Sequence, residues 1–398
     1  MRAPGADLDA SIAQNRMGTL VIKTRPGAKV TVEQIRHEFW FGSTLPTGAF
    51  TGRMAPQDIA RWKETFLANF NAGVIEGSFK WHEMEPEKGK VNYSIVDSML
   101  AWADQEAIPL RGHCIFWGIP NRVQDWVKQL GDADLRMALE QRARSIGARY
   151  RGRFAEFDLN NEMMHANYYA ERLGPRITAQ MAAWVKEGDP NAKLFVNDYD
   201  ITTGNRLDDY VKHIRGLLDM GVPLAGIGVQ GHLHGDSFDP AALQKALDEL
   251  AKFNLPIRIT EFNFPGQRSK YYTTGRAAKL TPEEENAKAE ALTRFFRICF
   301  AHPAVAGIMM WGFWEGANWI PQSSLYQRDW TPTPAAAAYR RLVFDNWWTR
   351  WTGQAGADGQ VAVPAFYGKH RVTADGKETV VNLSRAERVK LVEMEGGL

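Results

Sequence analysis

The sequence predicts an α/β fold, a (β/α)8 TIM barrel with a small accessory β-unit formed by the N- and C-terminal segments. Three observations favour this fold. Short apolar runs alternate with amphipathic stretches over about 300 residues, and the pair repeats eight times. Polar residues gather where the apolar runs end. The chain of 398 residues is long enough for one such barrel and a small additional unit.

Residues 1–38 are predicted to form a β-hairpin segment outside the barrel. They begin with polar, alanine-rich sequence, and two β-like runs follow at 19–23 and 29–35. Pro26-Gly27 lies between the runs and is typical of a turn. We therefore expect the two runs to pair with each other.

Residues 39–348 are predicted to form the barrel. The expected strands are 39–43, 72–77, 109–116, 154–160, 194–197, 226–230, 256–260 and 307–311. The expected helices are 56–70, 95–105, 135–150, 176–186, 205–220, 240–253, 282–300 and 333–344. Asp239-Pro240 and Thr281-Pro282 each place a proline in the first turn of an expected helix, where its missing N–H costs no hydrogen bond.

Residues 349–398 change character and are predicted to be a β-rich accessory segment. Strand-like runs fall at 361–363, 368–373, 378–382 and 389–393. Because the termini of a domain often lie close together, we expect the N-terminal segment to complete this unit. Closure of the barrel's amino-terminal face is the favoured role, and glycan binding is the alternative.

Composition excludes several classes of partner. The 48 basic and 46 acidic residues leave a net charge of +2, which predicts no nucleic-acid partner. No apolar run is long enough to span a membrane. Cys114 and Cys299 lie in apolar stretches and are expected to be buried thiols. The first residues carry no signal region. We expect a secreted or periplasmic monomer whose signal peptide is absent from this sequence, with a cytoplasmic location as the alternative.

Two expected strands each end in a glutamate, Glu162 and Glu261. An isolated glutamate is most often a solvated surface charge, so the pair is what matters. In a barrel of parallel strands, both carboxyl groups would lie at the same end, where active sites are found. One carboxylic acid and one carboxylate facing the same bond suit glycosidic cleavage. We expect Glu162 to be the general acid/base with a raised pKa, and Glu261 to be the ionised nucleophile.

Other polar and aromatic residues follow the expected strands at the same end. Those expected to bind substrate are Glu76, Lys80, His113, Trp117, Asn161, Tyr199, Gln230, His232, Trp311 and Trp319. Alone, His113 or His232 is more often a structural histidine, so their convergence with the other residues carries the argument. Asn161 is expected to bond the sugar 2-hydroxyl and the tryptophans to stack on sugar rings. Asn263 is expected to orient His232, which fixes Glu261. No metal-ligand spacing or phosphate-binding glycine motif is present, which predicts no metal and no cofactor.

Ordered motifs along the predicted barrel resemble those of the family 10 glycoside hydrolases, chiefly retaining endo-β-1,4-xylanases. The motifs are Lys80-Trp81, Arg111-Gly112-His113, Asn161-Glu162, Asn197-Asp198-Tyr199, Gln230-Gly231-His232, Ile259-Thr260-Glu261 and Trp311-Gly312 with Trp319. The resemblance covers residues 35–345. It implies a (β/α)8 fold, net retention of configuration, no cofactor, and xylan or a xylo-oligosaccharide as substrate.

The chain departs from the family pattern at three positions. Gly77 stands where the family usually has an asparagine, Gly118 where a histidine commonly follows the tryptophan, and Asn263 where an aspartate is usual. A bulky loop at 163–169 also follows Glu162. These departures leave open another β-linked glycan or short xylo-oligosaccharides as substrate. A barrel that binds carbohydrate without catalysis is the alternative from another class.

Overall fold

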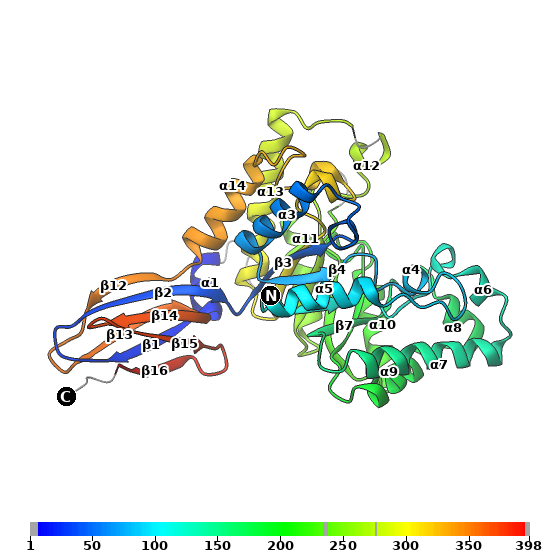
Figure 1. Ribbon diagram of the computed structural model, residues 1–398, viewed down its shortest axis with the longest axis horizontal. Helices are drawn as coiled ribbons and strands as arrows, with labels where there is room; N and C mark the ends of the chain where they lie inside the picture. Colours follow the sequence, from blue (N-terminus) through cyan, green and yellow to red (C-terminus); the bar gives the residue numbers. More distant parts are fainter. Residues whose placement is uncertain (1–6, 234–237, 275–276, 395–398) are drawn as a thin grey trace.

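The computed structural model describes residues 7–233, 238–274 and 277–394, and its centre is a closed barrel of parallel strands (Figure 1). The strands are β3 (Trp40–Leu45), β4 (Ala72–Ile75), β5 (Leu110–Gly112), β6 (Phe116–Trp117), β7 (Glu156–Asn161), β8 (Leu194–Asp198), β9 (Leu224–Val229), β10 (Ile257–Phe262) and β11 (Val305–Met310). Strand β11 pairs with β3, and β5 pairs with both β4 and β7, so the sheet closes on itself. The predicted fold class is confirmed.

A major helix follows each barrel strand and covers the outside of the sheet, as the sequence predicts. These helices are α3 (Pro56–Asn69), α5 (Ser94–Gln105), α7 (Asp132–Arg149), α9 (Ile177–Gly188), α10 (Leu207–Asp219), α11 (Pro240–Ala251), α13 (Pro282–Ala301) and α14 (Pro334–Arg340). Shorter helices lie in the connections: α2 (Gly48–Thr51), α4 (Trp81–Met84), α6 (Asp125–Lys128), α8 (Tyr168–Leu173) and α12 (Lys270–Thr274). Helix α13 begins at a defined residue because Thr281 and Glu284, on either side of Pro282, form a reciprocal capping box.

The third barrel strand is interrupted, so the continuous strand expected at 109–116 was wrong. Its two pieces, β5 and β6, both pair with β7, and residues 113–115 lie between them. At the interruption, His113 Nδ1 lies 2.8 Å from Asp158 Oδ2 in β7. A side-chain hydrogen bond thus occupies the place where the backbone leaves the ladder.

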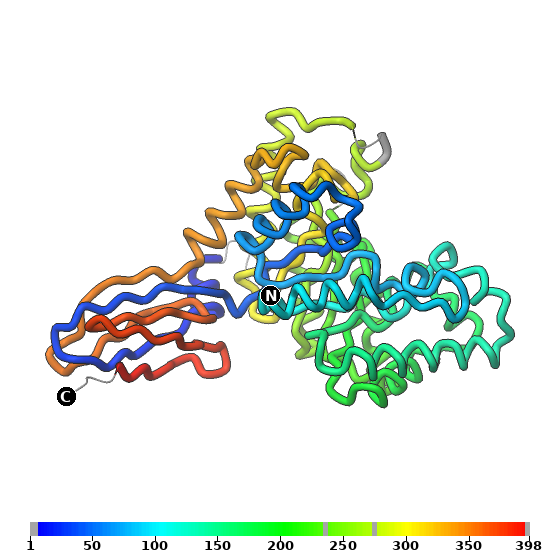
Figure 2. The backbone as a smooth tube through the Cα atoms, viewed as in Figure 1, coloured from blue at the N-terminus to red at the C-terminus, as the bar shows by residue number. Residues whose placement is uncertain are grey.

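The accessory β-unit contains strands from both ends of the chain, as expected. Strand β1 (Met17–Lys23) lies between β13 (Gln360–Phe366) and β16 (Val389–Glu393). Strand β2 (Lys29–His37) lies between β12 (Arg350–Gln354) and β14 (Gly368–Ala374), with β15 (Lys377–Leu383) beyond. Figure 2 shows the two blue N-terminal strands among the orange and red C-terminal ones. Residues 1–6 and 395–398 of the predicted terminal segments lie outside the described residues.

The hairpin expected at the N-terminus was wrong, because β1 and β2 belong to different sheets and do not pair with each other. Leu20 and Ile22 of β1 and Val30 and Val32 of β2 are buried in one shared core. Two sheets that pack face to face bury alternate residues in this way. The turn at Pro26-Gly27 therefore carries the chain from one sheet to the facing one.

A helix that the sequence analysis did not predict, α1 (Leu8–Arg16), connects the β-unit to the barrel. Asp7 caps its start by accepting from the backbone of Asp9 and Ala10. At its end, the buried Arg16 guanidinium donates to the carbonyl oxygens of residues 300, 302 and 305, which follow or close helix α13. The carbonyls of Phe300 and His302 lie at the carboxyl end of α13 and lack helical partners, which Arg16 supplies. Val305 begins β11, so the same guanidinium also ties that strand to α1.

Cys114 and Cys299 are buried free thiols, as expected. Within the ranges described, no helix has both the length and the apolar character that crossing a membrane requires.

Candidate active site

Glu162 follows β7 directly, in a left-handed backbone conformation with φ of 59°. Its backbone N–H donates to the Asn197 carbonyl at 2.9 Å, which fixes the turn against β8. Its two carboxyl oxygens accept from neutral donors: Trp117 Nε1 at 2.9 Å and Gln230 Nε2 at 2.8 Å. Burial and the negative charge of Glu261 both raise the pKa of Glu162. This carboxyl group is therefore suited to hold a proton.

Glu261 lies within β10 and is 5% exposed. Asn197 Nδ2 donates to one carboxyl oxygen at 2.9 Å, and His232 Nε2 lies 3.1 Å from the other. Burial alone would raise the pKa of Glu261, but the His232 hydrogen bond and the nearby His113 and Lys80 charges lower it to about 2. This carboxyl group is ionised.

The two glutamates therefore have pKa values shifted in opposite directions within one site. The negative charge of Glu261 is itself one cause of the raised pKa of Glu162. Paired titratable groups whose environments separate their pKa values are a recurrent feature of acid/base sites. The arrangement places a carboxyl group suited to hold a proton beside one that is ionised.

Asn197 connects the two halves of the site, although it is absent from the predicted binding set. Its amide also donates to Asn161 Oδ1 at 2.9 Å, while its own oxygen accepts from Thr260 Oγ1 at 2.6 Å. As a result, Asn161 Nδ2 is buried with no hydrogen-bond partner in the described part of the chain. A buried donor in this state points to a ligand acceptor. The Asn-Asp-Tyr run at the end of an expected strand was the signal for Asn197.

Aromatic rings and a lysine form one side of the site. Lys80 Nζ lies 4.8 Å from the Trp117 ring centre and 5.8 Å from that of Trp311. The Trp311 ring meets His113 edge-on at 5.2 Å between centres. Trp319 meets His232 edge-on at 4.9 Å. Six of the predicted binding residues therefore form one group, and two of them, Trp117 and His232, also contact the two glutamates.

The two remaining predicted residues lie past strand ends and are partly exposed. Glu76 follows the last residue of β4, and Tyr199 follows that of β8. The Tyr199 ring is stacked on His165, a residue absent from the predicted set.

Asn263 has a different supporting contact from the expected one. Its amide donates to the Trp311 carbonyl at 3.2 Å and to Ser323 Oγ at 2.8 Å. His232 Nδ1 is buried and has no hydrogen-bond partner among the residues described, so Asn263 does not hold the His232 ring through its side chain. Asn263 instead ties β10 to the loop after β11.

Asp158 supports the site through His113 and is also absent from the predicted set of site residues. It is fully buried, accepts two hydrogen bonds from Arg111, and lies 2.8 Å from His113 Nδ1. The signal was an acidic residue inside an otherwise buried strand, because such a charge must be paired.

The positions of Gly77 and Gly118 differ in the space around them. A Cβ atom at Gly118 would lie 3.2 Å from Tyr168 N and 3.3 Å from Tyr169 Cδ2, so the 163–169 loop fills this space. Tyr168 N also donates to the Gly118 carbonyl at 2.9 Å. A Cβ atom at Gly77 would meet only Thr47 Oγ1, at 3.6 Å. The 163–169 loop therefore fills the space beside Gly118, whereas the space beside Gly77 is open.

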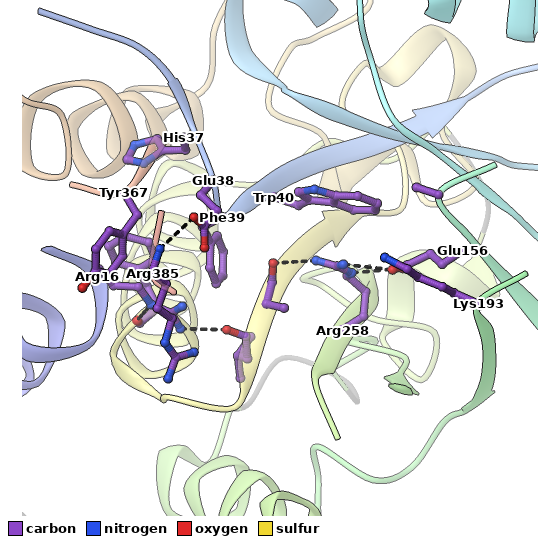
Figure 3. Close-up of a pocket in the computed structure, with 14 residues that line it drawn as sticks. Arg16, His37, Glu38, Phe39, Trp40, Glu156, Lys193, Arg258, Tyr367 and Arg385 are labelled. Atoms are coloured by element: carbon purple, nitrogen blue, oxygen red, sulfur yellow. Dashed lines mark hydrogen bonds and ion pairs between the residues drawn. The ribbon is translucent and has the colours of Figure 1, made fainter. Parts of the chain in front are cut away.

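A hollow of about 300 Å³ lies at the opposite end of the barrel and is not part of this site (Figure 3). It is lined by residues that include Arg16, Trp40, Glu156, Arg258 and Arg385. In Figure 3, Arg258 is joined to Glu156, with Nε and Nη2 at 3.0 and 2.9 Å from the two carboxyl oxygens. In the part of the chain that is described, no group of three or more His, Cys, Asp or Glu side chains is placed to hold a metal ion.

Comparisons with known proteins give one family. The profile described as Glycosyl hydrolase family 10 matches residues 33–342. The chain is 36% identical over 338 residues to the anti-sigma-I factor RsgI6 of Acetivibrio thermocellus, covering 85% of this chain and 41% of the relative. It is 36% identical over 293 residues to endo-1,4-beta-xylanase 1 of Arabidopsis thaliana, covering 73% of this chain and 28% of the relative. The chain thus spans less than half the length of either relative.

Solved structures of other proteins have the same barrel fold. The crystal structure of xylanase 10B from Thermotoga maritima matches with a TM-score of 0.69 at 23% identity. The match covers 78% of this chain and 96% of that one.

Proposed function

The chain belongs to glycosyl hydrolase family 10, and from this membership we propose that it is a retaining endo-β-1,4-xylanase. Glu162 acts as the general acid/base and Glu261 as the nucleophile. The observation that carries the proposal is the pair of hydrogen-bonded carboxyl groups at the carboxyl end of the barrel: Glu162 accepts from neutral donors only, whereas Glu261 is bound by Asn197 and His232, and their pKa values are shifted in opposite directions.

In the first step, the Glu261 carboxylate attacks the anomeric carbon and forms a glycosyl ester. The bond to the leaving oxygen breaks as Glu162 gives that oxygen its proton. The ester removes the negative charge of Glu261, and that charge was one cause of the raised pKa of Glu162. The pKa of Glu162 therefore falls in the intermediate, and its carboxylate can take a proton from water in the second step. Water attacks the same carbon, Glu261 leaves, and the configuration is retained.

The neighbouring side chains bind and orient the sugar. The buried Asn161 Nδ2 donates to the sugar 2-hydroxyl, a contact that strengthens in the transition state. Lys80 and His113 bind sugar hydroxyl groups near Glu261, and both side chains stabilise the negative charge of Glu261. Trp311 and Trp319 form apolar walls against the C–H faces of the sugar rings. Glu76 also contributes to substrate binding, and the buried Gln230 holds Glu162 in place beside the sugar.

Xylan is the proposed substrate because a relative at 36% identity is named an endo-1,4-beta-xylanase. Two features favour a related β-linked glycan or short xylo-oligosaccharides as the alternative: the open space beside Gly77 and the loop packed on Gly118. A second candidate is carbohydrate binding without turnover, since one relative that is 36% identical is named an anti-sigma-I factor and not an enzyme. Both carboxyl groups and their partners are present in this chain, which supports catalysis over that candidate.

The product profile from xylohexaose, run beside cellohexaose and mannohexaose, tests the proposal. Cleavage of internal bonds of xylohexaose is the expected result. Preferred cleavage of another hexamer, or release of single units from one end, contradicts the substrate or the endo action. Binding of a hexamer without cleavage supports the second candidate.

A further inference from the structure

The loop after Glu162 places a histidine ring flat against Tyr199. The His165 and Tyr199 ring centres are 3.5 Å apart and their planes differ by 11°, so the two rings are parallel and in full contact. His165 Nδ1 lies 2.8 Å from Asp198 Oδ1, and its Nε2 lies 3.8 Å from Asp200 Oδ2. Both ring nitrogens therefore face carboxylates, and the orientation of the ring is fixed.

His165 carries a positive charge at neutral pH. Burial alone would lower its pKa, but the hydrogen bonds and charges of Asp198 and Asp200 raise the pKa to about 9. Asp200 is also paired with Arg268, whose Nη2 lies 3.0 Å away. A cation on the face of an aromatic ring is attracted by the ring quadrupole, which adds to the stacking contact.

The stacked pair lies beside Glu162. His165 N–H donates to the Glu162 carbonyl at 3.1 Å. Burial raises the pKa of Tyr199 to about 12, and Glu162 is the first of the neighbouring charges that contribute. Tyr199 is partly exposed, and no second aromatic ring contacts it among the residues described. One face of the Tyr199 ring is thus covered by His165, and the ring lies near enough to Glu162 for the charge of that carboxyl group to act on it.

We propose that His165 is a positioning residue: held between Asp198 and Asp200, it fixes the Tyr199 ring as a rigid wall for the sugar on the leaving-group side. This inference rests on the proposed glycoside hydrolase function. It assigns part of the selectivity for the leaving group to a loop residue outside the predicted binding set.

The hydrogen bonds around Asp198 separate this role from a role in folding the Glu162 turn. Met164 N donates to Asp198 Oδ2 at 3.0 Å, and Tyr199 N donates to Asp198 Oδ1 at 2.9 Å. Both bonds come from the backbone and remain when the His165 side chain is removed. The turn after Glu162 keeps these ties, whereas Tyr199 loses the ring on which it rests.

The test compares His165→Ala with the unmodified enzyme on two substrates. Xylohexaose places sugars on both sides of the cleaved bond, whereas p-nitrophenyl β-xylobioside places no sugar on the leaving-group side. We expect kcat/KM to fall about tenfold on xylohexaose, the upper range for an aromatic stacking contact. On the aryl glycoside we expect a loss of less than about threefold.

A double-mutant cycle with Tyr199→Ala tests whether His165 acts on the substrate through Tyr199. If His165 acts through Tyr199, the double variant is no worse on xylohexaose than Tyr199→Ala alone. Tyr93→Ala is the matched control, since it removes a partly exposed tyrosine outside the site whose ring has the Arg149 guanidinium 4.2 Å from its centre. It should not distinguish between the two substrates.

Three results would overturn the inference: equal losses on both substrates, additive losses in the double variant, or the same difference between the two substrates from Tyr93→Ala. If His165→Ala does not fold, as judged by thermal unfolding, His165→Gln keeps a donor for Asp198 without the ring and takes its place. If the unmodified enzyme cleaves neither substrate, the proposed function itself is contradicted. That outcome is distinct from one in which the enzyme is active but His165→Ala loses equal activity on both substrates.

Discussion

The two ends of strand β7 carry two carboxyl groups with opposite properties. Glu156, its first residue, accepts from Arg111 Nε at 2.5 Å and from Arg258 Nη2 at 2.9 Å. Burial would raise the pKa of Glu156, but the charges of Arg258 and Arg111 lower it. Glu162, just past the last residue, has neutral partners, and its pKa is raised. A distance of only six positions along the chain separates a carboxyl group in a structural ion pair from one whose pKa is raised.

The difference lies in the charge of the hydrogen-bonding partners, because both carboxyl groups are largely removed from water. Burial disfavours the charged form of any carboxyl group, and adjacent cations reverse that effect. The amino-terminal end of the barrel supplies arginines and is held together by them. The carboxyl-terminal end supplies Trp117 and Gln230 and leaves Glu162 able to hold a proton. The hollow in Figure 3 lies beside paired charges and is therefore interpreted as structural.

The largest expected effect is at Glu261. Glu261→Ala removes the nucleophile and should lower kcat on any glycoside by a factor on the order of 10⁵. Steady-state kinetics on xylohexaose measure this loss, and far-UV circular dichroism checks that the barrel still folds. Activity near that of the unmodified enzyme would show that Glu261 is not the nucleophile.

Glu162→Ala sharpens the comparison, because its loss of activity should differ between a substrate with a poor leaving group and one with a good leaving group. On xylan the variant should lose about 10²- to 10⁴-fold, because the departing sugar oxygen needs a proton. On an aryl glycoside the first step should be spared, since the phenolate leaves without one, and a burst of phenolate should precede slow turnover. Equal loss of the first step on both substrates would argue against Glu162 as the acid.

Glu156→Gln tests the other end of the strand. Removing one partner of a buried ion pair leaves the arginines uncompensated and should lower the free energy of unfolding by about 3–5 kcal/mol. Denaturant unfolding measures the change. The matched control is Glu33→Gln, which removes an exposed carboxylate 3.8 Å from Arg371 and should cost less than about 1 kcal/mol.

The pH dependence of Glu156 has a defined sign. Since its folded pKa is lowered, its contribution to stability is complete above the unfolded pKa of about 4.3 and is lost as the pH falls through the folded pKa. The stability difference between the Gln variant and the unmodified protein should therefore shrink in acid. A constant difference from pH 7 into acid would contradict this role.

The smallest effect concerns Trp117, whose hydrogen bond lowers the pKa of Glu162. Trp117→Phe removes that donor, so the pKa should rise, and the alkaline limb of kcat/KM should move to higher pH by up to about one unit. Trp330→Phe removes a similar donor from Asp58 outside the site and should leave the profile unchanged. A limb that moves to lower pH would contradict the interpretation of Glu162.

Local patterns predicted the barrel and the two glutamates, because alternation of strands and helices and strand-end charges are visible over short distances. What was missed depends on distant partners. Strand β1 pairs with residues more than 300 positions away, so the turn at Pro26-Gly27 could not reveal that it connects two sheets. The direction of the Asn263 amide depends on Ser323, and the role of His165 depends on a ring that β8 delivers.

The most direct test of the account is to trap the glycosyl–enzyme with a 2-deoxy-2-fluoro xylobioside that carries an activated leaving group. Mass spectrometry of the intact protein and of its peptides would locate the added disaccharide. The account predicts one added glycosyl unit on the peptide that contains Glu261, and none in Glu261→Ala. A label on another residue, or hydrolysis that inverts the anomeric configuration, would contradict it.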